Sequence, residues 1–314
     1  MVANPQSPNE RPGEALARAE VFLKAMVHMG TAALNVGEHE LSLGLPDLHR
    51  LANKYKMPLL SANIYASKTK TPEFTRIWVK KFGQFKVGMF GLITSTPPDL
   101  SRLFVDQGLE VHDPQEEARA VVKELQAQNC DMIVVLSQMN KHEVGELLEK
   151  VPGIHLVLGT NTMELTMQLV AAGTGYFADA FTKGKYIGEV TVQMREKRDR
   201  YYAANMRASM ETDRADAARQ LQSLQIQIES ADQKDSGLQL TKETRQIVEQ
   251  QMVAVRARLQ RLTMQLEGVV AAPPNASTLD FSMNAISAEI LEDPFVDGLV
   301  RKFQEKFAKR ESSH

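Results

Sequence analysis

Short apolar runs alternate with amphipathic stretches across residues 14–194, and this alternation restricts the fold more than any other feature of the chain. In the amphipathic stretches the apolar residues recur three and four positions apart, as on one face of an α-helix. The apolar runs are as short as buried strands. We predict helices at 14–28, 45–55, 113–126 and 142–150, and strands at 32–36, 58–63, 86–93, 132–136, 154–158, 168–172 and 186–194. The alternation predicts a layered α/β fold with its functional groups at the carboxyl ends of the strands.

The composition changes sharply after Met194. Residues 211–270 contain no proline and only two glycines, and their apolar residues recur every three or four positions in two blocks. This heptad spacing predicts two helices, at 207–231 and 242–268, that zip together as an antiparallel coiled-coil hairpin projecting from the α/β body. Gly237 lies in the polar stretch between them, where the chain would reverse. In the alternative interpretation, the two helices simply pack on the body.

The remaining segments complete a three-part organisation. Residues 195–200 mix charges of both signs and are interpreted as a solvated start to the helical region. Two prolines within 271–277 end the second helix and predict a linker. Residues 279–283 are a candidate short strand, and Asp293-Pro294 opens a last amphipathic helix. We therefore expect an α/β domain at 1–194, a helical hairpin at 195–270, and a linker with a C-terminal helix at 271–314.

Charge and composition exclude several classes of partner. The formal net charge of -2 gives no attraction to nucleic acid or to an anionic membrane, so we expect neither as a partner. The single cysteine, Cys130, excludes an internal disulfide. The chain has no run of about 18 apolar residues, so no transmembrane segment is expected. Residues 1–13 are polar and lack the basic and apolar regions of a signal peptide, which places the chain as written in the cytoplasm unless its true start lies upstream.

Six short blocks follow one another in the α/β region and carry a family resemblance. They are NVGEHELSLG (35–44), PLLSANI (58–64), VGMFGLIT (87–94), DMIVVLSQMN (131–140), VPGIHLVLGTNTM (151–163) and GKYIG (184–188). Over about residues 17–194 they resemble the 5'-nucleotidase branch of the calcineurin-like metallophosphoesterases, in which the first block is usually written GNHEFDxG. The resemblance implies a layered α/β sandwich of the metallophosphoesterase type. The family's earlier D-x-H and GD blocks have no counterpart before Glu14, so we expect the sandwich to lack its first strand or strands.

The resemblance also implies a centre of two divalent metal ions (Mn, Zn, Fe or Co) that bind the phosphate and activate water. At the family's ligand positions this chain has Glu38 in place of Asn, Gln138 in place of His, and Asn161 and Met163 in place of the two His of GHxH. A carboxylate suits these metals, but amide oxygens bind them less well than imidazole, and a thioether is a soft ligand. We therefore expect the metal centre not to form and no cofactor to bind.

His39 keeps the place of the family histidine that contacts the phosphate, and Ser42 replaces the acid that orients it. The resemblance makes His39 a candidate catalytic residue. The alternative is a hydrogen-bonded structural histidine beside a turn.

Two functional hypotheses follow from these residues. The first is a degenerate, non-hydrolytic member of the 5'-nucleotidase-like group that binds or scaffolds through the hairpin at 207–268, by self-association or with a protein partner. The second is a metal-dependent 5'-nucleotide phosphoester hydrolase whose first metal-binding blocks lie upstream of a truncated start. The resemblance implies a periplasmic or cell-envelope location in either case.

Overall fold

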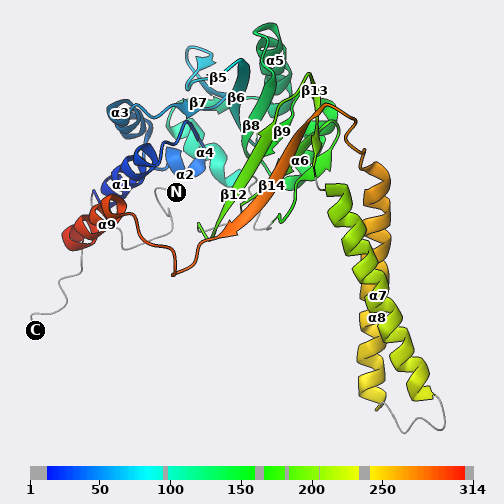
Figure 1. The fold of residues 1–314 in the computed structure, drawn as a ribbon. Helices are drawn as coiled ribbons and strands as arrows, with labels where there is room; N and C mark the ends of the chain where they lie inside the picture. The colour runs from blue at the N-terminus through cyan, green and yellow to red at the C-terminus, as the bar shows by residue number, and fades with distance from the viewer. Residues whose placement is uncertain are drawn as a thin grey trace, which may run out of the picture. The chain divides into compact units, whose positions relative to one another are not determined.

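The computed structural model describes residues 13–94, 98–159, 166–180, 184–204, 206–232 and 241–307. The chain divides into two compact units. Unit 1 combines Met1–Glu189 with Ser282–His314, and unit 2 is Val190–Phe281. Figure 1 shows the α/β body of unit 1 and the long helix pair of unit 2.

The largest sheet in the described part of the chain has six strands, in the order β10-β11-β9-β8-β6-β5. These strands are β5 (Trp78–Phe82), β6 (Phe85–Ile93), β8 (Met132–Gln138), β9 (Leu156–Leu158), β10 (Val170–Ala172) and β11 (Gly175–Ala178). β6, β8, β9 and β11 run parallel, while β5 and β10 pair antiparallel at the two edges. The apolar run of β8 is buried almost throughout, as expected of a strand covered on both faces.

Two capped helices pack their apolar faces into the core of this sheet. α5 (Pro114–Ala127) begins at Asp113, whose carboxylate accepts hydrogen bonds from backbone N–H groups of the first turn. α6 (Lys141–Lys150) begins at Asn140, which forms a capping box with Glu143. Buried residues of both helices and of β6, β8 and β9 form one hydrophobic cluster. The layered α/β fold expected from the sequence is confirmed.

A second core lies where α1 (Glu14–His28) and α3 (Leu45–Tyr55) meet the parallel pair β1 (Leu34–Asn35) and β2 (Leu59–Leu60). Glu20 of α1 accepts hydrogen bonds from the side chains of Lys54 and Tyr55 at the end of α3, and these bonds lower the pKa of Glu20 to about 2. The other elements of unit 1 are α2 (Glu38–Leu41), β3 (Ile64–Ala66), β4 (Thr71–Pro72), α4 (Pro98–Asp106), β7 (Leu109–Val111) and α9 (Pro294–Phe307). α9 packs on α1, and β3 lies between β4 and β7 in an antiparallel sheet.

The strand predicted at 58–63 is shorter in the structure, where β2 covers only Leu59–Leu60. The strand is shortened by the buried Asn63, whose side chain makes hydrogen bonds to backbone groups in place of backbone pairing between strands. Its amide donates to the carbonyl oxygens of Ile93 and His112, and its Oδ1 accepts from the Ile93 N–H. The chain thus turns out of the strand at a side chain that ties it to the end of β6.

A further sheet has three strands, with β14 lying between β12 and β13. These strands are β12 (Tyr186–Gln193), β13 (Lys197–Ala203) and β14 (Ala276–Ala285). The interpretation of residues 195–200 as a solvated start to the helical region is therefore wrong. β13 pairs parallel with β14 in a register that places Tyr201 opposite Ser277. Tyr201 and Ser277 are both buried, so packing and pairing outweigh the charged composition of the segment.

The helical hairpin predicted from the heptad spacing is confirmed. α7 (Met206–Asp232) and α8 (Lys242–Gly268) lie side by side and antiparallel (Figure 1). Ala217 of α7 and Val248, Val255 and Leu266 of α8 are buried. No helix in the described residues is long and apolar enough to cross a membrane.

Replacing Gly91 of β6 with alanine is expected to lower the free energy of unfolding by about 3 kcal/mol, the upper end of ordinary overpacking costs. An added Cβ would lie 2.1 Å from Asn35 Oδ1 and 2.6 Å from the backbone oxygen of Leu60. Gly145→Ala in α6 is the matched control, because a Cβ there meets nothing within 4 Å. It should raise stability by about 0.5–1 kcal/mol. Urea unfolding of both variants measures the difference, and equal stabilities would contradict the close approach at Gly91.

Candidate functional site

Parallel strands of the α/β body end at one edge. β6, β8 and β9 are parallel neighbours that end at Ile93, Gln138 and Leu158, so their carboxyl ends lie together. β1 joins them, because the side-chain amide of Asn35 donates to the carbonyl oxygen of Leu92 at 3.2 Å. This edge carries three of the blocks that resemble the ligand blocks of the family, and it is where an α/β fold places its site.

The turn after β1 presents Glu38 and His39. Glu40 is buried, 3% exposed, and its Oε2 accepts a hydrogen bond from the Gly37 N–H at 3.0 Å, which fixes the start of α2. The His39 side chain is 49% exposed, and its Nε2 lies 3.6 Å from Glu38 Oε1. Ser42 Oγ donates to the backbone oxygen of His39 at 2.7 Å. Ser42 therefore contacts the backbone of His39, while the carboxylate beside the imidazole is that of Glu38.

Gln138 packs directly over the turn at Gly37. A Cβ built on Gly37 would lie 1.7 Å from Gln138 Oε1 and 2.4 Å from its Nε2. The position therefore accepts only glycine while Gln138 keeps this conformation. Of the predicted site residues, the structure thus brings Gln138 next to the Glu38–His39 turn. The sequence indicated neighbouring strand ends but not this contact.

Asn161 and Met163 lie outside the described residues. The segment that leads to them leaves β9 at Gly159, which has a φ of +84°. A Cβ at Gly159 would lie 2.9 Å from the backbone oxygen of Ser137, so the ends of β8 and β9 touch. The described part of the block at 151–163 therefore ends at the same edge as Gln138.

Asn35 and Glu40 are two polar side chains to which the sequence reasoning assigned no role. Glu40 holds the turn described above. The Asn35 Oδ1 atom is buried and has no hydrogen-bond partner in the described part of the chain. Both residues belong to the NVGEHE block. The burial of Glu40 and of the Asn35 Oδ1 atom, which a sequence alone does not reveal, is what distinguishes them.

The described side chains at this edge do not by themselves suit a centre of two metal ions. Glu38 supplies a carboxylate, but Gln138 supplies a neutral carboxamide, which is a weaker donor to transition metals than imidazole. Among the described residues, no three His, Cys, Asp or Glu side chains come together in a way that suits a metal ion. The imidazole of His39 lies beside the carboxylate of Glu38.

Part of the sequence is similar to the sequences of known nucleotidases. The chain is 29% identical to a 5'-nucleotidase of Vibrio cholerae over 143 residues, which are 45% of this chain and 26% of that protein. Protein UshA of Escherichia coli is 30% identical over 143 residues, with the same shares of each chain. A 2',3'-cyclic-nucleotide 2'-phosphodiesterase/3'-nucleotidase of Salmonella typhimurium is 29% identical over 153 residues, 43% of this chain and 24% of that protein. The similarity thus spans about a quarter of the length of these relatives. No protein-family model matches the chain.

Two solved structures share the fold. The calcineurin-like phosphoesterase YfkN of Bacillus subtilis superposes with a TM-score of 0.52 at 16% identity, over 57% of this chain and 63% of that one. The sulfate thiohydrolase SoxB of Thermus thermophilus gives a TM-score of 0.51 at 20% identity, over 58% of this chain and 33% of that one. At these identities the likeness concerns the fold alone.

Proposed function

We propose, from the premise that this chain has the metallophosphoesterase fold and resembles the 5'-nucleotidase branch in sequence, that it is a non-hydrolytic binding protein with a degenerate site. The observation that supports this most is the carboxamide of Gln138 at a histidine position, packed on Gly37 beside Glu38 and His39. A site of this donor set lacks the metal charge that phosphoester hydrolysis uses to activate water and to stabilise the phosphoryl oxygens.

The hairpin within residues 195–270 is the proposed binding element. Its buried residues hold the two helices together, yet large apolar side chains also remain on its surface. Ile226, Ile247, Val253 and Met264 are 53%, 54%, 66% and 61% exposed. These exposed apolar side chains are available for contact with a second protein. We propose self-association of the chain through contacts of this kind.

Sedimentation of the purified chain over a range of concentrations tests this proposal. The wild-type chain should form dimers or larger species, and a chain carrying Ile247→Glu and Val253→Glu should sediment as a monomer. A chain carrying Gln250→Glu and Gln251→Glu is the control, because these positions are exposed and receive the same added charge. A wild-type chain that is monomeric at every concentration would contradict self-association.

The alternative function is metal-dependent hydrolysis of 5'-nucleotides with two divalent metals. The named relatives favour it, as does the retained His39 beside Glu38. It requires further metal ligands from upstream sequence, so in-frame D-x-H and GD segments in the DNA before Met1 would support it. The family resemblance also supports a periplasmic or envelope location, which fractionation of the producing cells tests.

A further inference from the structure

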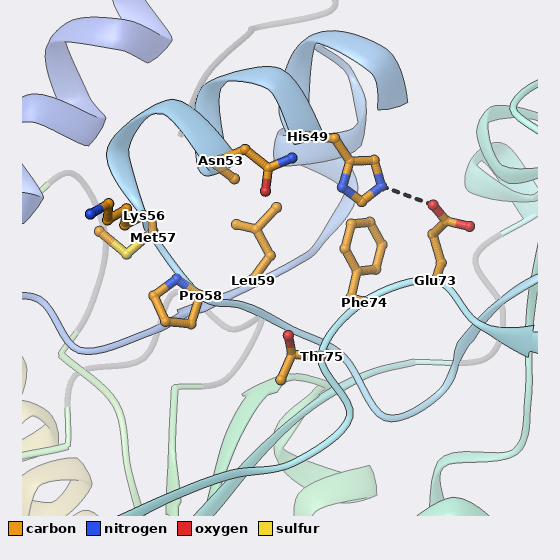
Figure 2. Close-up of a pocket in the computed structure, with 10 residues that line it drawn as sticks. His49, Asn53, Lys56, Met57, Pro58, Leu59, Glu73, Phe74 and Thr75 are labelled. Carbon is orange, nitrogen blue, oxygen red and sulfur yellow. Dashed lines mark hydrogen bonds and ion pairs between the residues drawn. The ribbon is translucent and has the colours of Figure 1, made fainter.

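A pocket of about 440 Å³ lies between α3, β2 and the segment of residues 73–75 (Figure 2). It opens at the amino end of β2. Because β1 and β2 are parallel and the candidate site follows the carboxyl end of β1, this pocket lies at the opposite edge. It is therefore separate from the Glu38–His39 turn and from Gln138.

Nearly buried apolar side chains form the base of the pocket, beneath a polar rim. Met57, Leu59 and Phe74 line it and are 4%, 6% and 7% exposed. One end is fixed by His49, whose ring stacks on Phe74 with centroids 5.3 Å apart. His49 Nε2 also lies 2.8 Å from Glu73 Oε1, and Figure 2 shows this hydrogen bond at the end of the pocket. The Glu73 carboxylate is thus already engaged by a protein group.

The rim carries three polar groups that the fold leaves available. The end of α3 turns through Lys56 in the left-handed region, with φ 53°, and the Lys56 and Met57 N–H groups donate to the carbonyl oxygens of Asn53 and Ala52. In the described part of the chain, the Asn53 carboxamide, the Lys56 ammonium and the Thr75 hydroxyl have no hydrogen-bond or ion-pair partner. Lys56 and His49 lie at opposite ends of the pocket in Figure 2, with Leu59 between them.

The charges that line this pocket favour a negatively charged ligand. Glu73 is paired with His49, so Lys56 is the charged lining residue that lacks a counter-ion within the described chain. Ligand pockets typically have volumes of about 300–1,000 Å³ and combine an apolar surface with a few convergent polar groups. A volume near the lower end of that range favours a body of one ring.

We propose that this pocket binds a small organic acid, a carboxylate carried on an apolar body of one ring. The ammonium of Lys56 pairs with the carboxylate, and the Asn53 amide and the Thr75 hydroxyl donate hydrogen bonds to the acid. The body covers Leu59 and the exposed part of Phe74. No chemical step is assigned to the bound acid.

Titration of the isotopically labelled full chain with 3-phenylpropionate, followed by amide NMR, tests this proposal. We expect saturable shifts at the amides of Asn53, Met57 and Thr75, and an affinity at least tenfold higher than for 3-phenylpropan-1-ol or 3-phenylpropylamine. Lys56→Met should weaken 3-phenylpropionate binding by about tenfold, the order expected for one charge-assisted contact. Lys68→Met, at another exposed lysine, should leave the binding unchanged.

Three results would contradict the proposed binding of an organic acid. The proposal is wrong if 3-phenylpropionate causes no saturable shift at these three amides. It is also wrong if the alcohol or the amine binds as tightly as the acid, or if Lys56→Met binds the acid as well as the wild type. Because Lys56 is exposed, its variant should keep the wild-type spectrum away from the pocket, which shows that the fold is intact.

Discussion

Val255→Asp is expected to separate α7 from α8 in the full-length chain. Val255 is 7% exposed on α8, within the surface by which the two helices contact each other. A carboxylate placed there has no partner, and burying an unpaired charge costs several kcal/mol. The helices would therefore separate or melt, since each long helix has only a weak intrinsic tendency to form alone in water.

Hydrogen exchange across residues 206–232 and 242–268 measures this effect. Exchange of the protected amides should accelerate by about a hundredfold or more, since local opening sets their protection. Ala254→Asp is the matched control, because Ala254 is the neighbouring residue on the same helix and is exposed. The half-buried Leu259 and Leu262 should give smaller effects with the same substitution. If Val255→Asp and Ala254→Asp exchange alike, the two helices do not depend on this contact.

Local signals were sufficient for the long helices. The predicted bounds of α1, α3 and α8 agree with the structure, because each helix has a clear apolar period and a marked end. α3 follows Gly44 and has Pro46 in its first turn, and α8 begins at Thr241, whose side chain caps the Thr244 N–H. Such signals lie within a few residues of the element that they define.

The elements that the sequence did not predict depend on distant partners. β5 has three exposed residues and two lysines, and it forms because it pairs with β6 across a tight turn at Gly83, which has a φ of +60°. β13 includes most of the charged run at 195–200 and pairs with β14, where Ser277, far along the chain, is the partner of Tyr201. Register of this kind is not visible in the composition of either strand.

The candidate site was predictable to a similar degree. The matched blocks placed Glu38, His39 and Gln138 at strand ends, and the structure brings them to one edge. The packing of Gln138 on Gly37 and the unpartnered oxygen of Asn35 are not visible in the sequence, because both arise from residues far apart along the chain. The positions of Asn161 and Met163 stay predictions, since both lie outside the described residues.

Purified chain supplied with Mn, Zn, Fe or Co should show no hydrolysis of nitrophenyl phosphate or of nucleotides above background. Hydrolysis of this type needs a metal-activated water and metal charge at the phosphoryl oxygens, effects that supply several orders of magnitude in rate. Glu38, which replaces the family's Asn, is the one strong ligand at the matched positions, and the amides of Gln138 and Asn161 are poor substitutes for imidazole.

The decisive measurement counts bound metal and turnover in the same preparation, with a 5'-nucleotidase assayed in parallel as the positive control. We expect fewer than two metal ions per chain and no turnover, with His39→Ala indistinguishable from the wild type. Two metal ions per chain, together with turnover that His39→Ala abolishes, would contradict the non-hydrolytic account.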